Sequence, residues 1–174
     1  MCVMCEGGSR QQARQNLYAQ ICALGFALLP VGRTWSNKGW AYTIGLIDKC
    51  DHQELVIAGV RLGEAVTVPD HLANAVLDGI HFDTCDAAVA FNADIGFVEV
   101  QALHIRRGLM DGWTDYHAAP ARPDLDLRAL QVVLPAGSRC YEHQGTQPRL
   151  DGNRHVSFDG LSRAARRSHP RPPR

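Results

Sequence analysis

Two cysteines near the start of the chain have the spacing of a metal-binding or redox pair. Cys2 and Cys5 form a C-x-x-C motif, which lets two thiolates hold one tetrahedral metal ion. A zinc site needs two more ligands, and Cys140 with His143 repeats the same two-residue gap. We therefore expect a structural zinc site at these four residues, which would tie the start of the chain to the end of the folded body.

Other uses of the cysteine pair stay open. Cys50 and His52 are alternative third and fourth metal ligands. Thiol redox catalysis is a second alternative, although the expected first helix starts four residues beyond Cys5 and no strand precedes the motif. Removal of Met1 would leave Cys2 as an N-terminal nucleophile with its own amine as the base. A pair of unliganded surface thiols is the remaining interpretation.

Histidines supply the next candidates for chemistry. His52 lies beside Asp51 and Glu54, and carboxylates next to an imidazole raise its basicity. We interpret this cluster as a solvated turn, and we expect His104 to be a hydrogen-bonded, half-buried residue on a strand. Neither pattern assigns a catalytic residue.

An enzyme would need a pocket, and four residues are candidates to line one. Trp35, His52, Trp113 and His117 fall in segments that could face a small molecule or cofactor between a sheet and its loops. The alternative interpretation is that Trp113 and Tyr116 belong to the core. The sequence has no Gly-rich phosphate loop, G-x-S-x-G elbow or H-E-x-x-H motif, so nucleotide hydrolases, serine esterases and common metalloproteases lack support.

Length and composition predict one globular domain. The chain has 174 residues, of which 45% are hydrophobic and 21% charged, enough for one core. No apolar run approaches the ~20 residues that cross a bilayer, and no secretory signal is visible, so we expect a cytosolic protein without a membrane partner. Six cysteines would then be reduced thiols, and we expect Cys22 and Cys85 to be buried.

Charge divides the chain into an acidic body and a basic tail. Residues 1–148 carry 11 Lys and Arg against 16 Asp and Glu, whereas residues 149–174 carry seven Arg against two Asp. We expect an α+β domain over residues 1–147 and a largely disordered tail over 148–174. The tail arginines could neutralise phosphates, but without interleaved aromatics we interpret the tail as solvated. The acidic body of a neighbouring copy is the other partner that it suits.

The elements that position these residues follow from periodicity. Residues 40–60 predict two antiparallel strands joined by a polar turn at 49–53. Ser9 and Gln12 predict a capping box for a helix over 9–24, and Thr67 with Pro69 predicts a second helix over 68–78. Further strands are expected at 26–31, 97–105 and 125–134, with a loop at 81–96 and a short helix at 108–119. The fold class is thus α+β, with a mainly antiparallel sheet of about five strands against two helices.

Four segments resemble a bacterial family, the domain-of-unknown-function family 4262. They are MCVMCEGG at the start, AYTIGL at 41–46, HQEL at 52–55 followed by Ala58-Gly59, and LQVVLP at 130–135. The resemblance spans about residues 1–143 and implies a small prokaryotic α+β protein without supplying an activity. Where the family usually has Pro-Asp, Gly and then Pro-Trp-Glu, this chain has Pro135-Ala136-Gly137 and Cys140-Tyr141-Glu142.

Two functional hypotheses follow. The first is a noncatalytic binding or accessory protein that zinc stabilises through Cys2 and Cys5. The second is a small-molecule enzyme with the His- and aromatic-lined pocket named above. A bound metal favours the first, and a ligand held by the aromatic residues favours the second.

Overall fold

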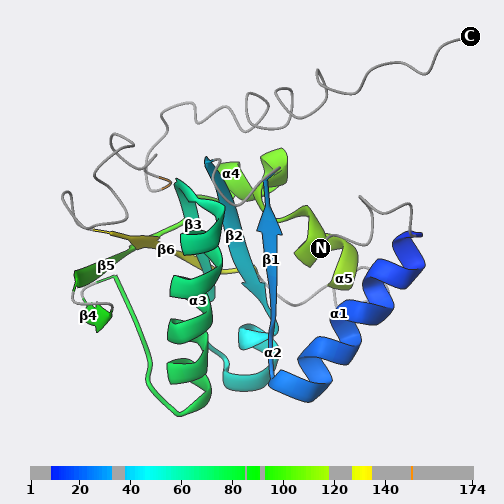
Figure 1. Cartoon of the computed structure of the whole chain (residues 1–174), viewed down its shortest axis with the longest axis horizontal. Coiled ribbons are helices and arrows are strands. Elements are labelled where there is room, and N and C mark those ends of the chain that lie inside the picture. The colour runs from blue at the N-terminus through cyan, green and yellow to red at the C-terminus, as the bar shows by residue number, and fades with distance from the viewer. Residues whose placement is uncertain are drawn as a thin grey trace, which may run out of the picture.

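The computed structural model describes residues 9–32, 38–84, 86–90, 93–117, 127–134 and 150. Figure 1 shows how the elements of this part of the chain surround a central sheet. In chain order they are α1 (Arg10–Leu24), β1 (Ala27–Val31), β2 (Lys38–Ile44), α2 (Leu46–Cys50), β3 (Glu54–Arg61), α3 (Leu62–Leu77), β4 (Ala87–Ala90), β5 (Ala93–Glu99), α4 (Ala102–His104), the π-helical turn η1 (Ile105–Leu109), α5 (Asp111–His117) and β6 (Ala129–Val133).

Six described strands form one sheet in the order β1-β2-β3-β6-β5-β4. Within it β3 and β6 pair in parallel, and the other four pairings are antiparallel. The predicted α+β class and the predicted antiparallel pair, β2 with β3, are both confirmed. β1 is an edge strand, as its Pro30 predicts, because proline cannot donate to a central ladder.

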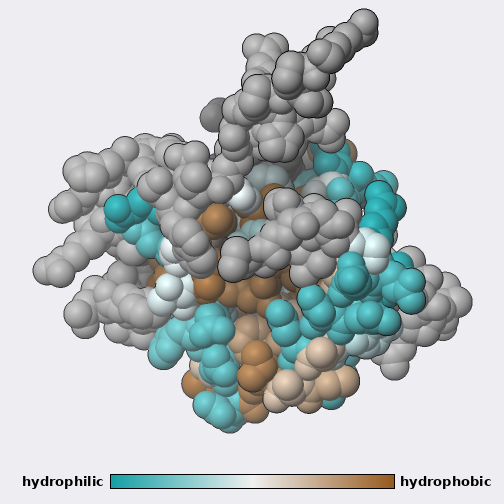
Figure 2. Space-filling view, turned by 45° about the vertical axis from the view of Figure 1, so that its right-hand side comes forward, coloured by the Kyte–Doolittle hydropathy of each residue, from teal (hydrophilic) through white to brown (hydrophobic). Residues whose placement is uncertain are grey.

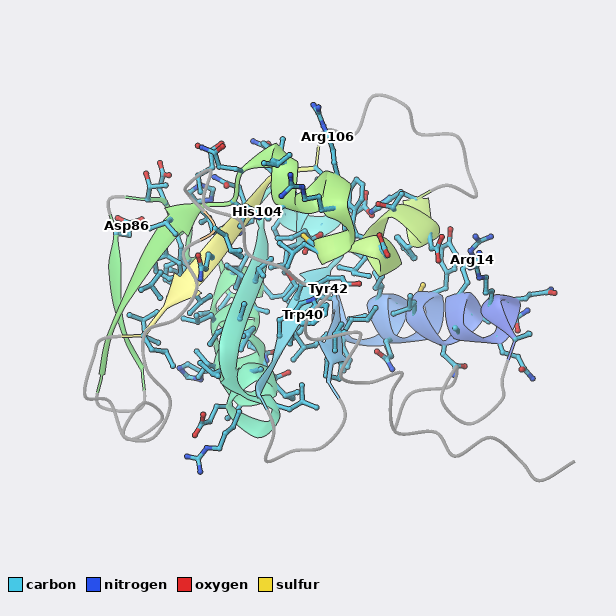
Figure 3. The ribbon with its side chains drawn as sticks, turned by 90° about the horizontal axis from the view of Figure 1, so that it is seen from above. Arg14, Trp40, Tyr42, Asp86, His104 and Arg106 are labelled. Carbon is cyan, nitrogen blue, oxygen red and sulfur yellow. The ribbon has the colours of Figure 1, made fainter. Side chains whose placement is uncertain are left out.

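Apolar side chains cover both faces of the sheet. α3 packs on one face, where Leu72 and Val76 share a core with Leu55 of β3. The opposite face carries a second core, in which Ile21 of α1 and Trp113 of α5 are buried. Seen from above, the strands lie between α3 on one side and α4 and α5 on the other (Figure 3). Helices on both faces explain why β3 reads as a nearly continuous apolar run.

Helix α1 begins and ends as predicted. Ser9 Oγ accepts the backbone N–H of Gln12, the Gln12 side chain accepts the backbone N–H of Ser9, and Gly25 ends the helix at φ 87°. Within α1, Ile21 is buried whereas Leu24 is 63% exposed. α1 lies beside the edge strand β1 rather than across the sheet (Figure 1). Figure 2 turns this side forward and shows many hydrophilic side chains around apolar surface.

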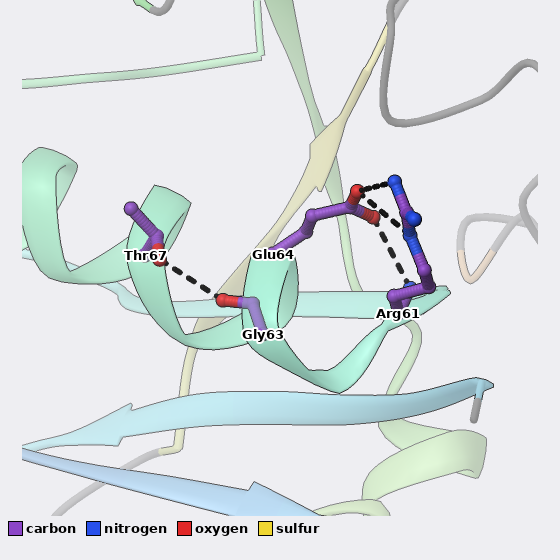
Figure 4. Close-up of polar contacts among 4 residues, drawn as sticks. All are labelled: Arg61, Gly63, Glu64 and Thr67. Atoms are coloured by element: carbon purple, nitrogen blue, oxygen red, sulfur yellow. Dashed lines mark hydrogen bonds and ion pairs between the residues drawn. The ribbon is translucent and has the colours of Figure 1, made fainter. Parts of the chain in front are cut away.

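Helix α3 begins six residues before the predicted start. The Glu64 carboxylate accepts the backbone N–H of Arg61 and pairs with its guanidinium, which caps the first turn (Figure 4). Thr67, predicted as the cap, instead donates its hydroxyl to the carbonyl of Gly63 inside the helix. Pro69 therefore lies within α3.

No helix in the described part of the chain is long and apolar enough to span a membrane.

The segment after α3 departs most from prediction. Residues 81–96 contain β4 and the start of β5, which form a hairpin rather than a loop. β5 then ends at Glu99 instead of residue 105, because Val100 donates to the carbonyl of Ala129 and the chain turns into α4. His104 consequently lies on a helix and is fully buried.

A residue from beyond the predicted domain boundary belongs to the core. Leu150 is fully buried in the α5-side core. The side chain of Gln131 in β6 accepts the Leu150 N–H at 2.8 Å, and the Leu150 carbonyl accepts the N–H of Gln101. Leu150 thus packs with the folded body, and the other residues of the predicted tail lie outside the described residues.

Candidate functional site

Glu54, the first residue of β3, is fully buried although it carries a carboxyl group. Its Oε2 accepts a 2.6 Å hydrogen bond from the hydroxyl of Thr43, near the end of β2. Its Oε1 accepts the backbone N–H groups of Gly45 at 2.8 Å and Ile47 at 3.5 Å, where α2 begins. Burial raises the pKa of Glu54, and these donors oppose that shift. The carboxyl group thereby joins two strands to a helix.

Local geometry explains why glycine precedes α2. Gly45 caps this helix with φ 117°, a conformation that side-chain-bearing residues rarely adopt, and it offers no capping side chain. A Cβ atom there would lie 3.1 Å from the carbonyl of Gly25 and 3.2 Å from Ile21. Glu54 takes over the capping role from the next strand. These contacts give the resemblance segments AYTIGL and HQEL a common structural function.

His52 is fully buried, so its predicted place in a solvated turn was wrong. Its Nδ1 lies 2.6 Å from the carbonyl of Gln53, and its Nε2 accepts the backbone N–H of Phe82 at 3.0 Å. The expected rise in basicity is also corrected. Burial lowers the pKa of His52, and the charges of His81 and Arg128 lower it further. The Glu54 carboxylate accepts from Thr43, and the exposed Asp51 pairs with Arg128.

The alternative metal pair of Cys50 and His52 does not suit the structure. Both ring nitrogens of His52 already bond backbone groups, so a metal would have to break one of them. Cys50 is exposed. Cys22, expected to be buried, is exposed as well, because it lies on the outer side of α1. Within the described residues, no group of three or more His, Cys, Asp or Glu could hold a metal ion.

An aromatic cluster lies on the opposite side of the sheet. The rings of Trp113 and His117, one turn apart on α5, have centroids 4.0 Å apart, and Tyr116 meets His117 edge-on at 4.7 Å. His117 Nε2 lies 3.8 Å from Asp48 Oδ2 of α2, which exceeds a direct hydrogen bond. All three aromatic side chains are buried, so the alternative interpretation that Trp113 and Tyr116 belong to the core is confirmed. We call these four residues the α5 cluster.

The indole N–H of Trp113 is the exceptional group in the α5 cluster. Nε1 is buried and has no acceptor among the residues that the structure describes. A buried donor without an acceptor costs about 1–3 kcal/mol and calls for an explanation. The comparable indole of Trp40 donates to the carbonyl of Leu109 at 3.0 Å. One of the two buried indoles therefore has an acceptor within the described part of the chain, and the other does not.

Tyr42 fixes α5 against the sheet. Its hydroxyl accepts the backbone N–H of Gly112 at 2.9 Å, and burial raises its pKa. A Cβ atom on Gly112 would approach this hydroxyl to 2.7 Å, so only glycine lets the helix lie this close. Figure 3 labels Trp40 and Tyr42 together at the centre of the molecule, whereas Arg106 points outward.

The structure brings only part of the predicted pocket together. Trp113 and His117 are in contact, but His52 packs against Phe82 in the core on the α3 side. Trp35 lies outside the described residues. A pocket shared by His52 and the α5 aromatics is therefore not formed, because the sheet separates them.

The predicted zinc ligands cannot be placed. Cys2, Cys5, Cys140 and His143 all lie outside the described residues, as do Cys85 and the arginines of the tail. Their metal, redox and nucleic-acid roles stay predictions.

Sequence reasoning missed several buried polar residues that organise the fold. Thr43 and Gln131 lie within apolar strands, yet each binds a residue from another element. A polar residue at an inward position of a strand was the available signal, since it needs a partner. Identifying that partner requires the topology, because Glu54 and Leu150 come from other segments.

Comparison with known proteins supplies a family and no activity. No curated protein matches the sequence, and no solved structure matches the fold at a significant level. The model of the family described as "Domain of unknown function (DUF4262)" matches residues 20–143, which is more than half of the chain. The matched range includes Glu54, His52 and the α5 cluster, and it begins after Cys2 and Cys5. The chain therefore belongs to the DUF4262 family.

Proposed function

We propose that this protein is a noncatalytic binding or accessory protein whose ligand meets the α5 cluster. The observation that carries the proposal is the buried indole N–H of Trp113, which lacks an acceptor among the described residues. A ligand acceptor atom would remove the cost of burying that donor. Glu54 and His52 support a noncatalytic role, because their polar atoms bond to Thr43 and backbone groups of the fold.

The surroundings of Trp113 set the chemistry of the ligand. Its ring and that of His117 offer a stacking surface, and the carboxylate of Asp48 lies beyond His117. A flat, largely apolar molecule with a hydrogen-bond acceptor at its edge fits these groups. Trp113 is 7% exposed, so the ligand would reach it at this exposed part of the residue.

NMR of the indole N–H groups tests this binding role. A set of flat heteroaromatic fragments, such as quinoline and isoquinoline, would be titrated into the 15N-labelled protein. We expect one of them to shift the Trp113 resonance while leaving that of Trp40, which is bonded to Leu109, unchanged. Trp113→Phe should abolish the binding, and Trp40→Phe should retain it. Binding that survives Trp113→Phe, or no shift with any fragment, contradicts the proposal.

An enzymatic role is the second candidate, favoured by one contact. His117 with the Asp48 carboxylate 3.8 Å away resembles a general base beside its orienting acid. A substrate would then be processed where the binding proposal places a ligand. Turnover of a fragment that shifts Trp113, lost in His117→Gln with binding retained, would establish this candidate over the first.

A structural zinc ion at Cys2, Cys5, Cys140 and His143 is part of the proposal, supported by the two matching two-residue spacings. A cytosolic location agrees with it, because zinc needs reduced thiols. Native mass spectrometry before and after chelation tests the metal. The background should be a Cys22→Ser, Cys50→Ser variant, because those two exposed thiols would react in any case. Protein without bound zinc, in which the remaining N-terminal thiols react freely, would exclude the site.

A further inference from the structure

The buried ring of His52 is held in one tautomer. Its Nε2 lies 3.0 Å from the backbone nitrogen of Phe82, which can only donate, so Nε2 must be the acceptor. The proton is therefore on Nδ1, which donates to the carbonyl of Gln53 at 2.6 Å. The ring is neutral in this arrangement, and both of its nitrogens are used.

The bond to Phe82 fastens the connection between α3 and β4 to the start of β3. Phe82 is buried, and its ring stacks on that of Phe97 in β5 with centroids 4.8 Å apart. The rest of this connection is largely exposed: His81, Asp83 and Thr84 all lie at the surface. The bond from Phe82 to His52 thus links an otherwise exposed segment to a buried core residue.

We propose that His52 is a proton-operated latch that holds the α3–β4 connection closed when it is neutral. Uptake of one proton from solvent places a hydrogen on Nε2, while Nδ1 keeps its bond to Gln53. Two donors then face each other, since the backbone N–H of Phe82 cannot accept. The bond is lost, Phe82 moves away from Phe97, and the segment around it opens.

Neighbouring groups set the direction in which pH acts. His81 meets the His52 ring edge-on at 4.7 Å, and Arg128 approaches from the residue before β6. Burial, His81 and Arg128 all lower the pKa of His52 below 6.5, and its two backbone contacts act against them. Asp51 does not offset the shift, because its carboxylate pairs with Arg128. The ring therefore stays neutral, and the latch closed, at the pH where an ordinary histidine takes up its proton, and the latch opens only as pH falls through the lowered pKa of His52.

An NMR titration of the full chain from pH 8 down to the pH at which Val56 loses its protection tests the latch. Long-range 15N spectra report the tautomer of His52, and hydrogen exchange reports the protection of the Phe82 amide. We expect protonation of His52 and an approximately tenfold loss of Phe82 protection to share one midpoint, the size expected for losing one hydrogen bond. Val56 in the centre of β3 is the reference, and its protection should not change.

His81→Gln is the matched variant, because it removes the adjacent titratable ring from an exposed position. It should shift the shared midpoint to higher pH while leaving the folded state intact. The proposal is overturned if His52 protonates and Phe82 keeps its protection. It is equally overturned if His52 stays neutral until Val56 also loses protection, since the whole domain would then be unfolding.

Discussion

Glu54 at the start of β3 and Trp113 on α5 are both buried, but only the side-chain polar atoms of Glu54 have hydrogen-bond partners among the described residues. The two oxygens of Glu54 accept hydrogen bonds from a hydroxyl and from backbone N–H groups. The indole nitrogen of Trp113 is equally sheltered but has no acceptor among the described residues. The carboxyl group of Glu54 joins β2, α2 and β3, whereas Trp113 packs against the ring of His117 on α5.

This difference separates residues that specify the fold from residues that are available to a ligand. A satisfied buried network fixes one arrangement of the backbone, because each member is costly to expose alone. A buried donor without an acceptor destabilises the protein on its own, and a ligand that supplies the acceptor removes this cost when it binds. His52 and Glu54 of the HQEL segment thus stabilise the fold, whereas we expect the α5 cluster to bind the ligand.

Removal of the Glu54 carboxyl should have the largest effect on stability. Glu54→Ala leaves the Thr43 hydroxyl and the Gly45 N–H without their acceptor and opens a cavity. We expect the free energy of unfolding at pH 8 to fall by about 3 kcal/mol. Urea denaturation with an unchanged m-value measures this loss.

Glu54→Gln is the control for that change. Its amide oxygen still accepts from Gly45, and its amide nitrogen faces the Thr43 oxygen, so the loss should be near 1 kcal/mol. Because burial raises the pKa of Glu54, the neutral amide also avoids the cost of burying a charge. Equal losses for the two variants would mean that the carboxyl acts only by filling space.

The sequence predicts elements well where the deciding contacts are local. Ser9 and Gln12 lie three residues apart, and the capping box that they predict is present. Thr67 carries an equally local cap signal, but α3 begins earlier, at the first turn where Glu64 bonds to Arg61. Competing local signals of this kind cannot be ranked without the packing around them.

In the candidate site, too, the sequence predicts contacts between residues that are close in the chain and misses those between distant ones. Trp113 and His117 are four residues apart on one helix, so their contact can be read from the sequence. His52 could not be placed, because its partner Phe82 is 30 residues away and comes from a connection without a periodic pattern. Likewise, the sequence alone does not reveal that the Trp113 indole has no acceptor among the described residues, because this depends on how other segments pack around it.

Paired Trp→Phe substitutions should give an intermediate effect that compares the two indoles directly. Both changes remove the same atoms from buried positions, but Trp40→Phe also strips the Leu109 carbonyl of its donor. We expect Trp40→Phe to lower the free energy of unfolding by about 1–2 kcal/mol more than Trp113→Phe. Urea denaturation of both variants at one pH measures the difference. If Trp113→Phe is the more destabilising, its N–H has a partner and the distinction between the two regions fails.

The smallest effect on stability is expected at the exposed pair of Arg128 and Asp51. Their side chains are 48% and 89% exposed, so the 2.8 Å contact is screened by water, and Arg128→Gln should change stability at pH 8 by less than about 0.5 kcal/mol. The same substitution removes a charge that lowers the pKa of His52. Loss of Phe82 protection should then begin at a higher pH than in the unchanged protein, which the NMR titration measures. A large loss of stability at pH 8 would mean that the Arg128–Asp51 pair stabilises the fold. A change only in the pH at which Phe82 loses protection would show that the charge of Arg128 acts on buried His52.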